Sequence, residues 1–113
     1  MAYTNKVAWE TLRSTNTAAL AGAYVAVGGP LLNPSYILKL VNNSNILITI
    51  SIDGVTDIDV APANSFWLYD EGKVGQSSAF PSMPEGTQIF IKSSTGGAGV
   101  GLVYLVSQYV VSN

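Results

Sequence analysis

Regular alternation of apolar and polar side chains is the feature that most constrains how this chain can fold. In "NILITISIDG", residues 45–54, isoleucine occupies every second position of Ile46–Ile52. Successive side chains of a β-strand point to opposite faces, so these isoleucines are expected to share one face and enter a core. Thr49, Ser51 and Asp53 are then expected to face water. A register shift of one residue would expose the whole apolar set, so the sequence fixes the register firmly.

Turn-forming residues divide the rest of the chain into similar short segments. Gly, Pro, Asn and Ser recur every six to ten residues, a spacing typical of an all-β sandwich or barrel. A length of 113 residues fits one domain. We therefore predict a single-domain, antiparallel β-sandwich over residues 1–113. The predicted strands are Val7–Arg13, Ala23–Val27, Tyr36–Val41, Ile46–Ile52, Asp57–Val60, Phe66–Tyr69, Thr87–Lys92 and Val100–Val111.

The local signals also predict how neighbouring strands connect. "NNSN", residues 42–45, is expected to turn the chain back, and Asp53-Gly54 is a strong hairpin signal. The segment Tyr36–Val60 is therefore predicted to form a three-stranded meander. The best helical candidate is "NTAALAGAY", residues 16–24, where Gly22 and Val25 limit the helix to about one turn.

The last predicted strand, "VGLVYLVSQYVV", is apolar on both faces. Such a strand must be covered on both sides. One interpretation places both coverings within the chain's own fold. The other places one face against a neighbouring subunit. The face expected to make this contact comprises Val103, Leu105, Tyr109 and Val111, and the opposite face comprises Leu102, Tyr104, Val106 and Val110.

Composition favours the second interpretation and disfavours several function classes. Hydrophobic residues make up 48% of the chain and charged residues 11%, against roughly 25% charged in an average soluble domain. So little polar surface indicates a homo-oligomer or another protein partner. With 5 basic and 7 acidic residues the net charge is -2, so we expect no nucleic-acid partner and no membrane binding. No apolar run reaches the roughly 20 residues of a membrane span, and no signal peptide is expected.

The sequence offers little for catalysis or for cofactors. It contains no His and no Cys, the side chains that most often act as a base or a nucleophile near neutral pH. We therefore expect neither an enzyme nor a cofactor. Asp53, Asp57 and Asp59 are weak candidates for a metal site, because "DGVTDID" lacks the glycine and glutamate positions of the calcium-binding loop. The glycine-rich "GGAGVG", residues 96–101, lacks the Lys-Ser/Thr ending of a phosphate loop and is interpreted as a connector.

The aromatic residues allow two interpretations. Trp9, Trp67 and the six tyrosines could form a platform for a sugar, since aromatic rings stack on the apolar faces of sugars. They are scattered over different predicted strands, however, and packing in a core or an interface accounts for them more simply.

Several phrases of the sequence resemble the small all-β structural proteins of tailed bacteriophage virions. These phrases are "AALAGAYVAVGGPL", "YILKLVNNSNILITISIDG", "APANSFWLYD", "PEGTQIFIKSSTG" and the closing "GLVYLVSQY". The resemblance extends from about Thr17 to Tyr109 and carries no catalytic signature. It implies a jelly-roll-like sandwich of about eight strands.

The resemblance also implies a function. The chain is expected to be a cement or decoration protein that binds the major capsid protein and stabilises the shell, commonly as a trimer. It would then reside on the capsid surface of the virion, and in the host cytoplasm during assembly. Met1–Asn5 is expected to be an extended N-terminal arm that contacts neighbours. The alternatives are a neck, tail or baseplate subunit, and a carbohydrate- or receptor-binding module.

Overall fold

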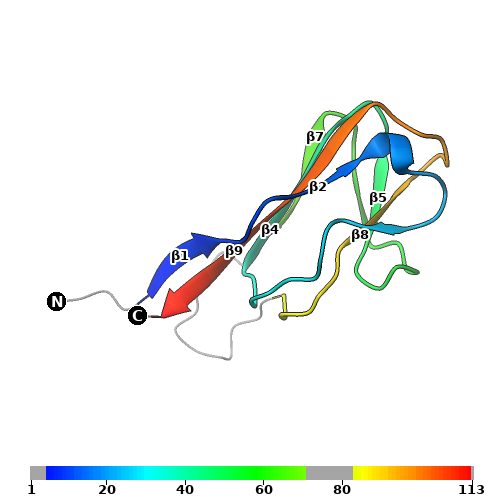
Figure 1. The fold of residues 1–113 in the computed structure, drawn as a ribbon. Coiled ribbons are helices and arrows are strands. Elements are labelled where there is room, and N and C mark those ends of the chain that lie inside the picture. Colours follow the sequence, from blue (N-terminus) through cyan, green and yellow to red (C-terminus); the bar gives the residue numbers. More distant parts are fainter. Residues whose placement is uncertain (1–4, 71–82, 113) are drawn as a thin grey trace.

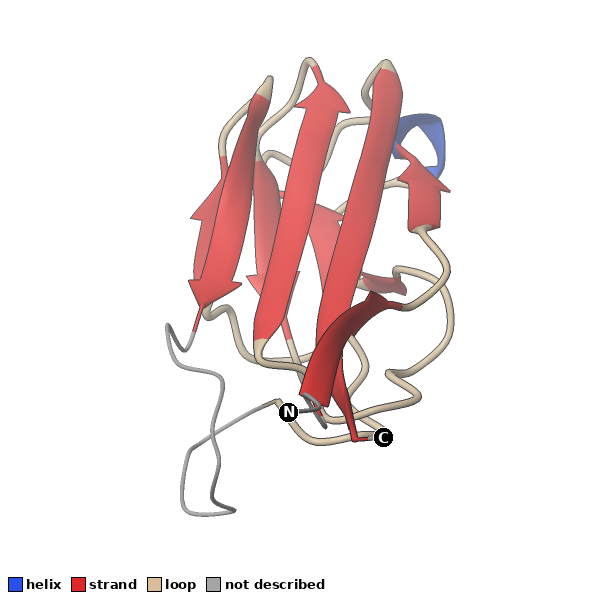
Figure 2. Cartoon of the chain, turned by 90° about the vertical axis from the view of Figure 1, so that its left-hand side faces the viewer, coloured by secondary structure: helices blue, strands red, loops and turns tan. Residues whose placement is uncertain are grey.

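The computed structural model describes residues 5–70 and 83–112. Within these residues the chain forms two antiparallel sheets that pack face to face, so the prediction of an all-β sandwich is confirmed (Figures 1 and 2). The predicted N-terminal arm lies outside the described residues except for Asn5, which begins the first strand. The strands are β1 (Asn5–Trp9), β2 (Arg13–Asn16), β3 (Val25–Ala26), β4 (Ile37–Ser44), β5 (Ile48–Ser51), β6 (Asp59–Ala61), β7 (Ser65–Asp70), β8 (Phe90–Ser93) and β9 (Gly101–Ser112).

The strand pairing is nested: the first strands of the chain pair with the last strand, and the later strands pair successively toward the middle of the chain. The larger sheet has the order β1-β9-β4-β7, with β2 also on β9, and the smaller sheet has the order β3-β8-β5-β6. Thus β1 and β2 pair with β9, β3 with β8, β4 with β7, and β5 with β6. A long hairpin with this nested pairing, rolled into two sheets, is the jelly roll. The expected fold class is therefore observed.

The hydrophobic core lies between the two sheets. The larger sheet contributes Leu38, Leu40, Trp67, Val103 and Leu105, and the smaller sheet contributes Ile48, Ile50, Ala61 and Ile91. Burying one such aliphatic side chain contributes about 1.5–3 kcal/mol to the free energy of unfolding. The burial of these side chains holds the two sheets together.

The predicted alternation in β5 is confirmed for its two isoleucines and is wrong for its two polar residues. Ile48 and Ile50 are fully buried, but Ile52 follows the strand and is 44% exposed. Thr49 and Ser51 were expected to face water and are instead buried. Their hydroxyls replace the hydrogen bonds that water would make: the Thr49 hydroxyl bonds Ser94, and Ser51 Oγ accepts from the amide nitrogens that follow it.

The predicted meander is wrong in its first half. The strand β4 belongs to the larger sheet and β5 to the smaller one, so the segment between them crosses the sandwich instead of making a hairpin. The side chain of Asn42 holds this crossing, because its Nδ2 donates to the carbonyl oxygens of Ile46, Ala61 and Pro62 at 2.8–3.1 Å. The second half is confirmed, since β5 and β6 pair directly.

Two further expectations changed in detail. The predicted strand Val7–Arg13 is interrupted, so that β1 and β2 pair with different parts of β9. The predicted helical turn is the short 3₁₀ helix η1 (Thr17–Ala19), in which the amide of Ala18 donates to the side chain of the N-cap residue Asn16. The outward-facing residues of β1, β4, β7 and β9 include several exposed apolar side chains, among them Val7, Trp9 and Phe66.

Candidate functional site

The structure divides the four predicted interface residues of β9 into two groups. Val103 and Leu105 are 0% and 1% exposed, so they are not available to a partner. Leu105 lies directly opposite Leu40 in the ladder with β4, and opposed residues share one face. Because the Leu40 face is the core face, the prediction for these two residues is wrong. The covering of this face comes from the chain's own smaller sheet.

The other two predicted residues lie in a different environment. Tyr109 is half-buried and pairs with Ala8, and Val111 pairs with Lys6. The side chain of Val111 lies outside the described residues. Both positions belong to the part of β9 that follows Gln108.

This part of β9 forms what we call the terminal ribbon, residues 5–9 paired with residues 108–112. The strand β4 begins opposite Gln108, so β1 is the only described strand that pairs with β9 beyond this point. The ribbon extends away from the smaller sheet (Figure 1). Its side chains Val7 and Trp9 are 40% and 60% exposed. Apolar side chains on a two-stranded extension form a surface that nothing described in the chain covers.

The outer face of the larger sheet carries a second apolar surface. The register places Phe66 of β7, Val41 of β4 and Tyr104 of β9 in one row across three strands. The row before it contains Leu68, Lys39 and Val106. Phe66 and Leu68 are 55% and 47% exposed. This face is thus largely apolar, with one lysine in its middle.

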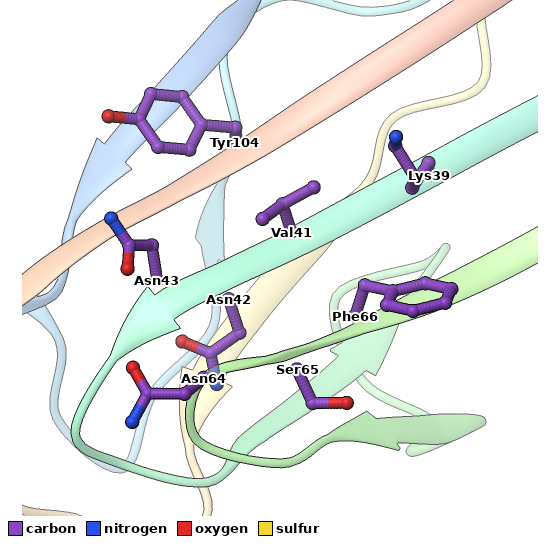
Figure 3. Close-up of a pocket in the computed structure, with 8 residues that line it drawn as sticks. All are labelled: Lys39, Val41, Asn42, Asn43, Asn64, Ser65, Phe66 and Tyr104. Atoms are coloured by element: carbon purple, nitrogen blue, oxygen red, sulfur yellow. The ribbon is translucent and has the colours of Figure 1, made fainter.

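A hollow of about 390 Å³ lies on this outer face (Figure 3). Val41 forms its floor, because its neighbours in the same strand and in both adjacent strands surround it (Figure 3). Two aromatic rings flank it, and amide and ammonium groups occupy the remaining sides. The lining residues are Lys39, Val41, Asn42, Asn43, Asn64, Ser65, Phe66 and Tyr104.

The polar side chains around the hollow differ in how they are used. Asn42 is buried, and its amide serves the crossing between the sheets. By contrast, the side chains of Lys39, Asn43 and Asn64 are exposed and make no hydrogen bond to any described residue. Asn64 has φ of 57°, the only positive φ of a described residue other than glycine. Its amide nitrogen is tied to the carbonyl oxygen of Ser44 at 3.2 Å, which fixes the turn.

The three candidate metal-binding aspartates do not converge. Asp53 accepts hydrogen bonds from the amides of Val55 and Thr56, whereas Asp59 accepts one from the indole nitrogen of Trp67 at 2.8 Å. In the described ranges no three acidic side chains form a group that could hold a metal ion. The Thr56 and Val55 amides, followed by the side-chain hydroxyls nearby, hold the pKa of Asp53 well below its usual value. Such an aspartate organises a turn.

Asp57 belongs to a separate network on the outer face of the smaller sheet. It accepts a hydrogen bond from the Tyr24 hydroxyl and forms an ion pair with Lys92 at 3.2 Å. The Lys92 ammonium lies 4.7 Å from the centre of the Tyr24 ring. The hydrogen bonds from Tyr24 and Lys92 lower the pKa of Asp57. Burial and the carboxylate of Asp57 raise the pKa of Tyr24 to about 12. The network attaches the loop before β6 to β8.

A buried ion pair ties the start of β2 to the loop before β4. Arg13 Nη2 lies 2.7 Å from Glu10 Oε1, and the two side chains are 10% and 2% exposed. Glu10 also accepts hydrogen bonds from the amides of Leu32 and Asn33. Arg13 donates to the carbonyl oxygens of Gly29 and Pro30. Burial raises the pKa of Glu10, but the hydrogen bonds from Arg13, Asn33 and Leu32 and the charge of Arg13 outweigh it, so the pKa is lowered.

Comparison with known proteins adds no relative. No family model matches the chain, and searches of curated proteins and of solved structures found no match. None of the helices in the described part of the chain is long and apolar enough to span a membrane. The terminal ribbon and the hollow on the larger sheet are two surfaces with exposed apolar side chains, Val7 and Trp9 on the first and Phe66 on the second.

Proposed function

We propose that this chain is a structural protein of a tailed-bacteriophage virion, without catalytic activity, that binds the capsid as a cement or decoration protein. The resemblance of its sequence phrases to small all-β virion proteins supports this proposal. Its jelly-roll fold is compatible with it, since viral capsid domains use this architecture. The observation that carries the proposal is the terminal ribbon.

The ribbon has the properties of a segment that is completed by a partner. A two-stranded β-ribbon is marginally stable in water, and three or more strands with an apolar face are needed for independent stability. Here the ribbon exposes Val7 and Trp9, and β1 has an open edge in the described part of the chain. A neighbouring protein can cover the side chains, add a strand to that edge, or do both.

Repetition on a particle would strengthen this contact. Each ribbon offers a small surface, but several ribbons of a homo-oligomer, with a trimer favoured, would bind a symmetric shell together. Linked contacts of this kind exceed the affinity of each contact by factors of about 10²–10⁴. The partner proposed is the major capsid protein, and the location is the capsid surface.

Capsids assembled from the major capsid protein of the encoding phage provide the test. The chain is added to these capsids, the capsids are sedimented, and the bound fraction is measured against concentration. We expect saturable binding that Trp9→Ala weakens at least about tenfold, because exposed Trp side chains dominate protein interfaces. The matched control is Val55→Asp, which changes a residue that is 80% exposed but lies in the loop between β5 and β6.

The proposal fails if the chain does not bind capsids, or if Trp9→Ala and Val55→Asp have equal effects. Cryo-electron microscopy of the intact virion separates the alternatives. Density for the chain at the neck, tail or baseplate would keep a structural role but reject the cement role.

A further inference from the structure

We propose that the hollow around Val41 on the outer face of the larger sheet is a saccharide-binding site. It holds two accessible aromatic rings together with three polar side chains that have no partner among the described residues. This inference does not depend on a capsid partner, and its test can succeed or fail separately.

The two rings provide surfaces on which a sugar can stack. A pyranose ring has an apolar face of C–H groups and an edge of hydroxyl groups, so it needs an aromatic surface beside hydrogen-bonding groups. Phe66 and Tyr104 stand on either side of Val41 (Figure 3). With strands about 4.8 Å apart, their backbones are roughly 10 Å apart. Val41 is small enough to leave the space between the rings open.

The polar groups match the hydroxyl edge of a sugar. An amide side chain offers both donors and an acceptor, and an ammonium group offers three donors. Sugar hydroxyls likewise both donate and accept, so Asn43, Asn64 and Lys39 can engage them. The backbone of Asn64 is fixed by its bond to the Ser44 carbonyl, and Asn43 and Lys39 stand on a central strand. The backbone positions of these side chains are therefore set before a ligand arrives.

Other small ligands fit the hollow less well. A volume of about 390 Å³ falls within the roughly 300–1,000 Å³ of small-molecule sites, and it suits a mono- or disaccharide. A purely apolar ligand would leave the amide groups without partners and remove them from water. Single-stranded nucleic acid requires a basic groove, whereas Lys39 is the only charged residue among the described residues that line this site. A neutral sugar, or one with a single carboxylate, can contact the aromatic rings and also pair with the amide and ammonium groups.

The site is separated from the terminal ribbon along the same strand. Tyr104 precedes Gln108, where the ribbon begins, by four residues of β9. At a rise of about 3.3 Å per residue this is roughly 13 Å. A chain that is bound to a particle through its ribbon therefore leaves the hollow accessible to a saccharide in solution.

The test begins with a glycan array of neutral and carboxylate-bearing sugars, probed with the full chain. The methyl glycoside of the strongest ligand is then titrated by NMR or calorimetry. We expect Phe66→Ala and Tyr104→Ala each to weaken binding about tenfold through the lost ring contact. Leu68→Ala is the matched control, because Leu68 is similarly exposed on the same strand and face but does not line the hollow.

Two more variants keep the test independent of folding. Asn64→Gly removes the amide side chain while tolerating the positive φ, and it should also weaken binding severalfold. Trp9→Ala in the ribbon should leave saccharide binding within about twofold of the unchanged chain, since additivity holds for distant sites. Thermal unfolding of each variant shows whether the sandwich is intact.

Three outcomes would overturn the inference. The first is that no sugar on the array binds. The second is binding that Phe66→Ala and Tyr104→Ala do not weaken. The third is an equal loss in Leu68→Ala, which would indicate that the whole sheet face meets a protein and that the hollow is not a sugar site.

Discussion

At the scale of single residues, the buried pair of Glu10 and Arg13 has more influence on stability than its position at the start of β2 suggests. The Glu10 side chain is 2% exposed and accepts hydrogen bonds from Arg13 and from the backbone of Leu32 and Asn33. Removing one partner of a buried ion pair leaves the other charge buried without compensation. Arg13 would be left in this state, because its side chain is only 10% exposed.

We therefore predict that Glu10→Gln lowers the free energy of unfolding by about 3 kcal/mol at pH 7. The lowered pKa of Glu10 means that its contribution is present above pH 4.5, the usual value, and is lost as the pH falls through the folded-state pKa. The stability difference between the two proteins should accordingly shrink in acid. Urea unfolding from pH 7 to pH 3 measures it.

Glu85→Gln serves as the control for this prediction, since Glu85 is exposed. Its effect should stay within about 0.5 kcal/mol. Equal stability of Glu10→Gln and the unchanged chain at pH 7 would contradict the assignment of Glu10 as a buried anchor.

The spacing of residues in the sequence predicted which side chains alternate between the faces of a strand. It could not predict which residues become neighbours across different strands. Phe66 and Tyr104 are 38 positions apart and become neighbours of Val41 only through the register of β4 with β7 and β9. No local pattern encodes such a register. For the two tryptophans the sequence favoured packing over a sugar platform, and Trp67 is indeed buried, beside Asp59, whereas Trp9 lies exposed on the ribbon.

At the scale of elements, each predicted strand overlaps at least one observed strand, and the errors concern the interruption between β1 and β2, the faces and the connections. In β9 the doubly apolar pattern was correctly recognised, but two of the residues assigned to a partner, Val103 and Leu105, lie in the core. Alternation specifies two faces without saying which is inward. In β5, Thr49 and Ser51 read as solvent-facing because hydroxyl side chains are usually wet. They are buried instead, and hydrogen bonds with Ser94 and from the amide of Gly54 satisfy their hydroxyls.

The terminal ribbon should be the least stable paired element of the molecule. Its strands lack a third neighbour in the described part of the chain, whereas β4 is paired on both sides. Regions with few buried contacts open locally at much lower free energy than core strands. We predict that, in dilute protein, hydrogen-bonded amides of β1 exchange at least about 100-fold faster than those of β4.

Hydrogen exchange followed by NMR over a series of protein concentrations tests this prediction. As copies associate, exchange in β1 should slow while exchange in β4 stays constant. Equally slow exchange of β1 and β4 at every concentration would show that the ribbon needs no partner.

At the scale of the whole molecule, the nested pairing brings the two ends of the described chain together. Asn5 lies opposite Ser112 in the ladder of β1 and β9, and both ends lie at the tip of the ribbon (Figure 1). The strand β9 lies between β1, β2 and β4, and so unites the larger sheet. The order of elements along the chain is therefore less important than the integrity of β9.

A circular permutation tests this conclusion. Asn113 is joined to Met1 by a short Gly-Ser linker, and new ends are opened between Gly96 and Gly97, where a side chain would meet nothing within 4 Å. Exposed loop tips tolerate such cuts, so the permuted chain should fold with a loss of no more than about 2 kcal/mol. Near-ultraviolet circular dichroism and the emission of buried Trp67 report the fold.

Opening the chain between Val106 and Ser107 is the matched control. This cut falls inside β9, where both residues pair with β4, and it divides the strand that joins β1 and β2 to β4. We expect this second permutant not to fold, because the two short pieces of β9 must each find their register with less apolar surface to hold it. If the first permutant unfolded, or the second folded equally well, the nested jelly-roll pairing would not be the arrangement that stabilises the chain.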